Sequence, residues 1–272
     1  MRTIVHLSDI HFGRIDEAVV GPLIETVRRL APDIVAVSGD LTQRARSHQF
    51  KAARAFLDAL PQPQIVVPGN HDVPLHNVFT RFIQPLHKYR RYITEDLRPL
   101  YHDDEMAVLG VSTARSFTIK GGRINEQQVA WMRDRLCSFD PEVVKIVVTH
   151  HPFDLPEGHD ERHLVGRARM AMEELADCGA DVFLAGHLHV SHTTHSAVRY
   201  KIKGHSALVI QAGTATSDRG RGEANSFNVI RVDRPRISVE RLEWLPDQEL
   251  FASAELENFR HTPDGWIRVE DI

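Results

Sequence analysis

The segment QIVVPGNHD, residues 64–72, joins an apolar run to a cluster of polar side chains. Residues 64–67 have the β-branched composition that is typical of a buried strand. Residues 69–72 follow a proline directly and supply an amide, an imidazole and a carboxylate at consecutive positions. The same arrangement, an apolar run that ends in His, Asp or Asn, recurs at four other places, residues 9–11, 39–40, 150–152 and 186–189.

Short apolar runs alternate with segments of helical periodicity through the first 184 residues. Strands are predicted at 3–7, 33–37, 64–67, 106–111, 143–148 and 181–184, and helices at 18–30, 49–60, 125–136 and 167–178. This alternation indicates an α/β fold. Each polar cluster then follows the carboxyl end of a strand, where open α/β sheets bind ligands.

The pattern changes after residue 206. Residues 207–211, 227–232 and 237–242 are predicted to form successive strands of an antiparallel second sheet. The chain has no internal repeat. We expect one domain over residues 1–245, and a C-terminal tail over residues 246–272, because the residues from 246 onward are polar with scattered aromatics.

Residues 75–105 are interpreted as an insertion into this domain. Apolar side chains recur at helical spacing over residues 75–86, and the basic and aromatic segment KYRRY follows at residues 88–92. A helix packed on the domain, or at an oligomer contact, is the simpler interpretation. The alternative is a cap over an active site that contacts a nucleotide base or an acyl chain.

The composition is that of an ordinary globular protein and disfavours several function classes. The 272 residues include 33 Lys and Arg against 37 Asp and Glu, a net charge of −4 with neutral histidines, and 17 histidines. This charge argues against dedicated nucleic-acid binding, which needs many contacts from Lys and Arg to phosphates. We find no signal-peptide pattern and no apolar run long enough to span a membrane, and we expect a cytoplasmic location.

The two cysteines, Cys137 and Cys178, stand far apart in the sequence and match no metal-binding or redox spacing. Both lie in apolar stretches, so we expect them to fill the core separately rather than to act as a pair. This favours a reducing compartment.

The polar clusters contain the ligand types of first-row transition metals, namely carboxylate, imidazole and amide oxygen. In extended backbone, Asp9 and His11 would point to one face, and so would His187 and His189. Glycines 39, 69 and 186 would permit the turns between strand and cluster. Two metal ions about 3.5–4 Å apart can activate water and clamp both oxygens of a phosphoryl displacement.

The ordered series Asp-x-His, Gly-Asp, Gly-Asn-His-Asp, His-His-Pro and Gly-His-x-His, between Asp9 and His189, strongly resembles the calcineurin-like metallophosphoesterase superfamily. Within this superfamily, the Gly-Asn-His-Asp motif and the chain length most resemble those of the bacterial class III cyclic-nucleotide phosphodiesterases. The resemblance implies a four-layer α/β/β/α sandwich, in which helices flank two mixed β-sheets.

The resemblance also implies a site with two transition-metal ions, iron or manganese, with zinc as the other candidate. One ion would be held by Asp9, His11, Asp40 and His189. The second would share Asp40 as a bridge and add Asn70, His150 and His187. His71 would bind no metal but would protonate the leaving oxygen, and Asp72 would hold its imidazole. A hydroxide that bridges the ions would attack a small phosphodiester, such as a cyclic nucleotide.

The remaining polar residues near these motifs have no assigned chemistry. His151 is either a support for the ligands or bonded to backbone, and His192 and His195 either hold a third metal or lie at the surface. His159 and His163 are expected in solvent. Four arginines are candidates for contact with a substrate, namely Arg115, Arg123, Arg219 and Arg221. Taken one at a time, each is expected at the surface, and the loop 219–223 is the best candidate.

Three other functions compete with a phosphodiesterase. A nucleotide-lipid pyrophosphohydrolase needs an apolar groove, which only residues 75–98 could supply. A DNA-processing nuclease is disfavoured by the net charge, and a non-catalytic scaffold by the intact ligand set. Whether the chain forms a homo-oligomer stays open.

Overall fold

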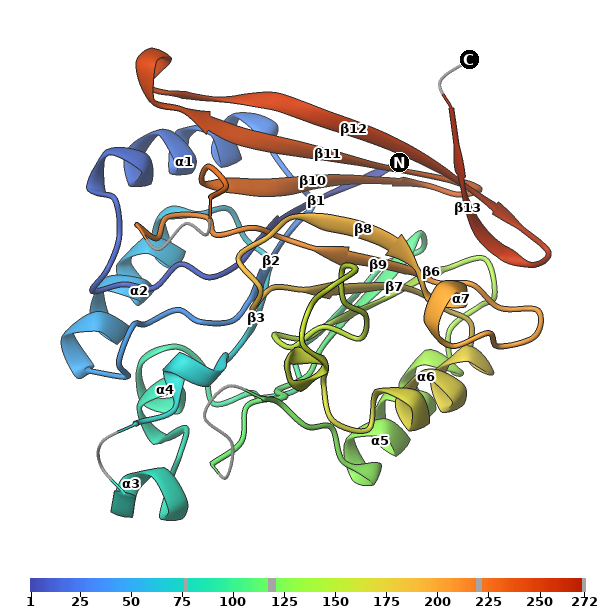
Figure 1. Ribbon diagram of the computed structural model, residues 1–272, viewed down its shortest axis with the longest axis horizontal. Coiled ribbons are helices and arrows are strands. Elements are labelled where there is room, and N and C mark those ends of the chain that lie inside the picture. Colours follow the sequence, from blue (N-terminus) through green and yellow to red (C-terminus); the bar gives the residue numbers. More distant parts are fainter. Residues whose placement is uncertain (76–77, 117–120, 219–221, 271–272) are drawn as a thin grey trace.

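Two β-sheets packed face to face form the centre of the molecule (Figure 1). The computed structural model describes residues 1–75, 78–116, 121–218 and 222–270. Side chains alternate across each strand, so Ile4 faces the layer between the sheets while Val5 faces the covering helices. Helices cover both outer faces, and the predicted α/β/β/α sandwich is therefore confirmed.

The first sheet has the strand order β13-β12-β11-β10-β1-β2-β3. Its members are β1 (Arg2–Leu7), β2 (Ile34–Ser38), β3 (Gln64–Val67), β10 (Ser226–Asp233), β11 (Arg236–Leu245), β12 (Leu250–Thr262) and β13 (Gly265–Val269). Strands β1, β2 and β3 are parallel, while β10 pairs antiparallel with the free edge of β1 and begins an antiparallel meander.

The second sheet has the order β4-β5-β6-β7-β9-β8. Its members are β4 (Leu100–His102), β5 (Met106–Gly110), β6 (Val144–Val148), β7 (Ala180–Ala185), β8 (His192–His195) and β9 (Leu208–Gln211). The four central strands are parallel, and β4 and β8 pair antiparallel at the edges.

The prediction of a separate antiparallel sheet after residue 206 is wrong. Strand β9 lies parallel to β7 in the second sheet, whereas β10 and β11 extend the first sheet. Residue periodicity predicts that a strand exists, but it carries no information on which sheet edge the strand joins.

The helices on the first sheet are α1 (Glu17–Leu30), α2 (Ser47–Ala59) and α4 (His87–Tyr92), and those on the second are α5 (Glu126–Leu136) and α6 (Ala168–Ala176). Helix α5 starts at a capping box, in which Asn125 Oδ1 accepts from the Gln128 N–H and Gln128 Oε1 accepts from the Asn125 N–H. Within the described ranges, no helix has the length and apolarity needed to cross a membrane.

The expected polar tail is instead part of the first sheet, because β12 and β13 continue it (Figure 1). Phe251, Phe259 and Trp266 are buried, whereas residues 253–256 of β12 and residues 267–268 of β13 are exposed. Exposed polar side chains, among them Ser253, Glu255, Arg260 and Arg268, give the segment the composition of a tail.

The expected insertion divides into three parts. Helix α3 (Val78–Ile83) exposes Phe79 and Ile83, whose side chains are 74% and 60% accessible. Helix α4 packs on the first sheet through Tyr89, which is fully buried and whose hydroxyl donates to the Val66 carbonyl at 2.9 Å. Residues 100–102 form an edge strand of the second sheet.

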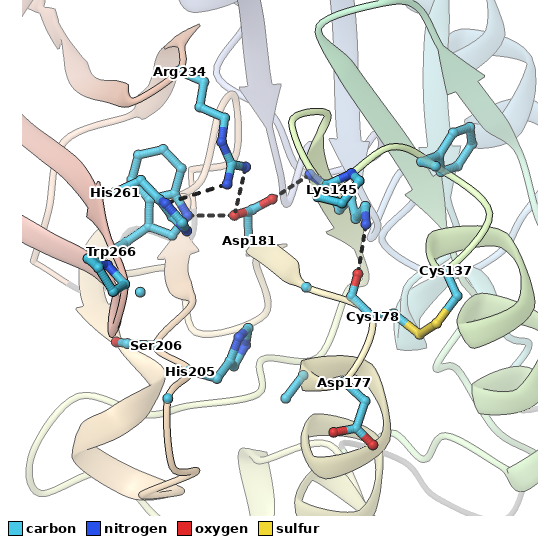
Figure 2. Close-up of a pocket in the computed structure, with 17 residues that line it drawn as sticks. Cys137, Lys145, Asp177, Cys178, Asp181, His205, Ser206, Arg234, His261 and Trp266 are labelled. Atoms are coloured by element: carbon cyan, nitrogen blue, oxygen red, sulfur yellow. Dashed lines mark hydrogen bonds and ion pairs between the residues drawn. A yellow bond between two sulfur atoms is a disulfide. The ribbon is translucent and has the colours of Figure 1, made fainter.

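Cys137 and Cys178 form a disulfide, so the prediction of two separate core cysteines is wrong. Helices α5 and α6 pack side by side, and each cysteine lies just beyond the C-terminal end of one of them. Figure 2 shows the bond beside a pocket that is also lined by Lys145, Asp181 and Trp266. The inference of a reducing compartment rested on unpaired cysteines and loses that support.

Candidate metal centre

The polar clusters meet at the carboxyl ends of β1, β2, β3, β6 and β7. The first three strands belong to one sheet and the last two to the other, so both sheets contribute to the site. The candidate ligands that come together are Asp9, His11, Asp40, Asn70, His150, His187 and His189.

Asp9, His11 and His189 form one group of donor atoms. The Asp9 Oδ1 atom lies 3.2 Å from His189 Nε2 and 3.5 Å from His11 Nε2, and the two Nε2 atoms are 3.2 Å apart. The other oxygen, Oδ2, accepts from the Ser8 hydroxyl at 2.7 Å and from the His187 N–H at 2.8 Å. One oxygen of Asp9 thus anchors the loops, while the other faces the imidazoles.

Asp40, Asn70 and His150 form a second group. His150 Nε2 lies 3.4 Å from Asp40 Oδ1 and 3.1 Å from Asn70 Oδ1, while its Nδ1 is 2.8 Å from the Ser38 carbonyl. Asp40 Oδ2 is 3.7 Å from His11 Nε2 in the first group. Asp40 therefore stands between the two groups, where a bridging carboxylate is expected.

Five of the candidate ligands have left-handed backbone conformations. The φ angles are 52° at Asp9, 54° at His11, 53° at Asp40, 74° at His187 and 60° at His189. The expectation of extended backbone at the two i, i+2 pairs is therefore wrong. Such angles cost free energy in residues other than glycine and concentrate at functional sites.

Gly39, Gly69 and Gly186 were all expected to permit turns of the backbone. Of these three, only Gly39 has a positive φ, of 90°. A Cβ atom at Gly69 would collide with the Asp40 carboxylate, and one at Gly186 would collide with the Ser8 hydroxyl. Gly69 and Gly186 are thus required for close approach of backbone to the ligands.

The electrostatics of the site fit metal ions. Asp9 and Asp40 are at most 1% accessible, and within the described part of the chain neither pairs with a lysine or an arginine. Burial opposes ionisation, but the imidazoles, His189 foremost for Asp9 and His150 for Asp40, hold the pKa of each carboxyl below its usual range. Buried charges of this kind are normally paired or coordinate metals.

Burial and the neighbouring carboxylates also shift the pKa values of the imidazoles. Burial lowers the pKa of His11 and, with help from the neighbouring His151, that of His187. Burial acts in the same direction on His150, but Asp40 outweighs it and raises the pKa of His150 to about 9. His11 and His187 are therefore neutral beside ionised carboxylates, the state in which both types of side chain bind a cation, whereas His150 would have to release a proton on binding a metal.

His71 lies at the rim of the site, with its side chain 21% accessible and its Nε2 4.0 Å from Asp40 Oδ2. Its Nδ1–H donates to the Gln43 carbonyl at 2.9 Å, so Nε2 is the nitrogen left to face the site. The prediction that Asp72 holds this imidazole is therefore wrong. Asp72 instead accepts from the N–H groups of Leu41, Thr42 and Gly69 and fixes the two neighbouring loops to each other.

Two further histidines support the cluster. His151 is buried, its ring centroid lies 4.6 Å from that of His187, and its Nδ1 is 2.8 Å from Thr113 Oγ1. His163, which was expected in solvent, is half-buried, with its Nδ1 2.9 Å from His187 Nε2. No motif spacing indicates this contact, because His163 lies 24 residues from His187 on another loop.

The other candidates lie elsewhere. His192 and His195 are on edge strand β8, and among the described residues neither joins a convergent group of metal donors. The Arg115 guanidinium bonds Gln128 on α5, and Arg123 is exposed. The candidates Arg219 and Arg221 lie outside the described residues.

Several known proteins are similar to this chain in sequence. The model of the family described as calcineurin-like phosphoesterase matches residues 2–191. A glycerophosphodiester phosphodiesterase of Enterobacter lignolyticus is 26% identical over 56% of this chain and 58% of its own length. A probable cyclic nucleotide phosphodiesterase of Moraxella catarrhalis is 24% identical over 74% of this chain and 76% of its own. The chain thus spans under two thirds of the first of these relatives.

Solved structures show the same fold. A purple acid phosphatase from yellow lupin superposes with a TM-score of 0.60 at 12% identity, over 89% of this chain and 51% of the phosphatase. A Vps29 mutant from Entamoeba histolytica superposes with a TM-score of 0.52 at 13% identity, over 95% of this chain and 99% of its own. At these identities the likeness concerns the fold alone.

Proposed function

Since this chain belongs to the calcineurin-like phosphoesterase family, we propose that it is a phosphodiesterase that uses two metal ions to hydrolyse a small phosphodiester. The observation that carries the proposal is the convergence of seven buried or half-buried donors around Asp40. A single loop with polar residues would not produce this set, whereas a site for two cations requires it.

In this proposal, one ion is held by Asp9, His11, Asp40 and His189, and the other by Asp40, Asn70, His150 and His187. When bound, the two ions would activate a water molecule and neutralise the charge of the phosphate. Iron and manganese are the metals we propose, with zinc as the alternative, because imidazole and carboxylate suit all three.

The chain itself supplies the acid. Since the Gln43 carbonyl fixes Nδ1 of His71, the ring presents Nε2 toward the site, and a proton on this atom would pass to the leaving oxygen. The same hydrogen bond opposes rotation of the ring away from the site. Asp72 does not contact the ring; its carboxylate accepts from the N–H groups of Thr42 and Gly69 and so holds these two loops together.

The substrate class is proposed from the relatives. The name of the Moraxella protein supports a cyclic nucleotide, as the sequence motifs do. A glycerophosphodiester is the second candidate, because the Enterobacter relative bears that activity in its name. Both are diesters with a single phosphate, so the proposed metal site serves either one.

A substrate panel tests the proposal. Protein reconstituted with Mn²⁺ is assayed on bis(p-nitrophenyl) phosphate, 3′,5′-cyclic AMP, glycerophosphocholine, p-nitrophenyl phosphate and a nucleotide-lipid pyrophosphate. We expect turnover of diesters to exceed that of the monoester, and chelation to abolish it. Absence of diester hydrolysis with metal bound, or faster cleavage of the pyrophosphate than of any diester, would contradict the proposal.

A further inference from the structure

The side chain of His163 contacts a proposed metal ligand from outside the five motifs. It ends the short helix η2 (Glu161–His163), and its Nδ1 lies 2.9 Å from His187 Nε2, with the ring centroids 5.0 Å apart. A nitrogen–nitrogen distance of 2.9 Å is that of a hydrogen bond, so one of the two atoms carries the hydrogen.

The direction of this bond decides whether His187 can bind a metal. A neutral imidazole has one N–H, and its other nitrogen carries the lone pair that a metal needs. If His163 donated, His187 would carry its hydrogen on Nδ1 and would have no free lone pair. If His187 donates from Nε2, its Nδ1 is free.

The position of His187 agrees with the second case. Nδ1 is the ring nitrogen nearer to its own main chain, and the His187 N–H is bonded to Asp9 Oδ2 at 2.8 Å. The ring also lies 5.1 Å from that of His150, a proposed ligand of the same ion. The nitrogen on the far side of the ring is the one that meets His163.

We propose that His163 is a positioning residue, which accepts the Nε2–H of His187 and so fixes the tautomer and ring orientation in which His187 Nδ1 binds the second metal. Histidine ligands commonly have such a partner on their other nitrogen. The inference rests on the proposed function, since it requires His187 to be a ligand.

The loop that carries His163 is itself anchored. Arg199 on α7 (Ser196–Arg199) bonds both Asp154 and Glu161, at the two ends of this loop, and the contact with Glu161 is 2.8 Å. The Val165 N–H donates to the Pro152 carbonyl at 2.9 Å and closes the loop at its base. His163 is therefore held in place independently of His187.

Three variants test the proposal. His163→Leu keeps the bulk but removes the acceptor, whereas His163→Asn retains an acceptor, Oδ1, at the same distance along the side chain. His159→Leu, on the same loop, is the matched control. Apoproteins are titrated calorimetrically with Mn²⁺, and circular dichroism checks that each is folded.

We expect wild type, His163→Asn and His159→Leu to bind two Mn²⁺ ions with similar affinities. In His163→Leu one site should weaken by about 10–100-fold while the other is unchanged. Wild-type affinity at both sites in a folded His163→Leu would overturn this inference and leave the proposed function intact. A wild-type protein that binds no Mn²⁺ would overturn the proposed function itself.

A second measurement uses the wild-type protein alone. Long-range ¹H–¹⁵N spectra of the histidine rings distinguish the two neutral tautomers in the apoprotein. We expect His187 to carry its hydrogen on Nε2, and a hydrogen on Nδ1 would overturn the inference.

Discussion

Asp40 is the residue on which the proposed site depends most, because its two carboxylate oxygens face the two groups of donors. Oδ1 lies 3.4 Å from His150 Nε2, and Oδ2 lies 3.7 Å from His11 Nε2. A Cβ atom at Gly69 would intrude on the same carboxylate. The absence of a side chain at Gly69 therefore leaves room for the Asp40 carboxylate.

Asp40→Ala is expected to lose metal from both sites, since the variant removes a ligand common to the two. Metal content after reconstitution with Mn²⁺ and gel filtration gives the result. Asp58→Ala, at an exposed carboxylate on α2, should retain the wild-type content. Full occupancy in Asp40→Ala would rule out the bridging assignment.

His71→Ala is expected to retain both metals and lose activity. The rate constant should fall by about 10²–10⁴-fold on a substrate with a poor leaving group, because that group needs a proton. The loss should be smaller for p-nitrophenolate, which leaves without one. His48→Ala, on the exposed face of α2, is the control. Equal losses on both substrates would refute the acid role.

Residue types and spacing in the sequence identified the candidate ligands, but not the atoms that orient them. The hydrogen-bond partner of the His71 ring is the main-chain carbonyl of Gln43. Every residue has such a carbonyl, so residue types cannot predict which one the ring contacts. The contact between His163 and His187 depends on how a loop folds back, which no local pattern encodes. The left-handed backbone at Asp9 and His187 was hidden for the same reason.

At the scale of elements, most of the strands and helices followed from periodicity, whereas the edge strands β4 and β8 and the last two strands, β12 and β13, did not. Strand β12 buries Phe251 on the helix-covered face of the first sheet and, beyond an irregularity in its pairing with β11, Phe259 in the layer between the sheets, where Trp266 of β13 also lies. Trp266 of β13 donates from Nε1 to Asp181 Oδ1 at 2.8 Å, and this bond ties the first sheet to the start of β7.

Trp266→Ala is expected to lower the free energy of unfolding by about 3–5 kcal/mol, because the side chain is only 1% accessible. Urea denaturation followed by circular dichroism measures the change. The neighbouring Ile267→Ala, at a side chain that is 41% accessible on the other face, should cost far less. Similar losses from both variants would show that β13 does not pack as described.

The disulfide between Cys137 and Cys178 should stabilise the pair of helices α5 and α6. Reduction is expected to lower the free energy of unfolding by about 2–4 kcal/mol. Urea curves with and without dithiothreitol measure the difference, and the double variant Cys137→Ser/Cys178→Ser should not respond to the reductant. If wild type is equally insensitive, the bond does not form in solution.

For the molecule as a whole, the proposed site joins the two sheets. Asp9, Asp40 and Asn70 follow strands of the first sheet, and His150 and His187 follow strands of the second. Metal ions bound between them would cross-link the sandwich at one end. The acidic net charge does not oppose this function, because two of the counted aspartates would be neutralised by the ions.

Removal of metal should therefore destabilise the whole fold. One site filled at 100 times its Kd contributes about 2.7 kcal/mol, which corresponds to a fall in Tm of at least about 5 °C on chelation. Differential scanning calorimetry of holo and apo protein measures it, and added Mn²⁺ should restore the Tm. An unchanged Tm in wild type, or the same metal-dependent shift in Asp40→Ala, would contradict the cross-linking role.

We propose that this cluster holds two metal ions, one on either side of Asp40. Crystals grown with Mn²⁺ and measured at an X-ray energy where manganese scatters anomalously show the ions directly. We predict two anomalous peaks about 3.5–4 Å apart, one among Asp9, His11 and His189 and the other among Asn70, His150 and His187, with Asp40 between them. No peak at the cluster, or a single peak away from Asp40, would contradict the assignment of two metal ions to this cluster.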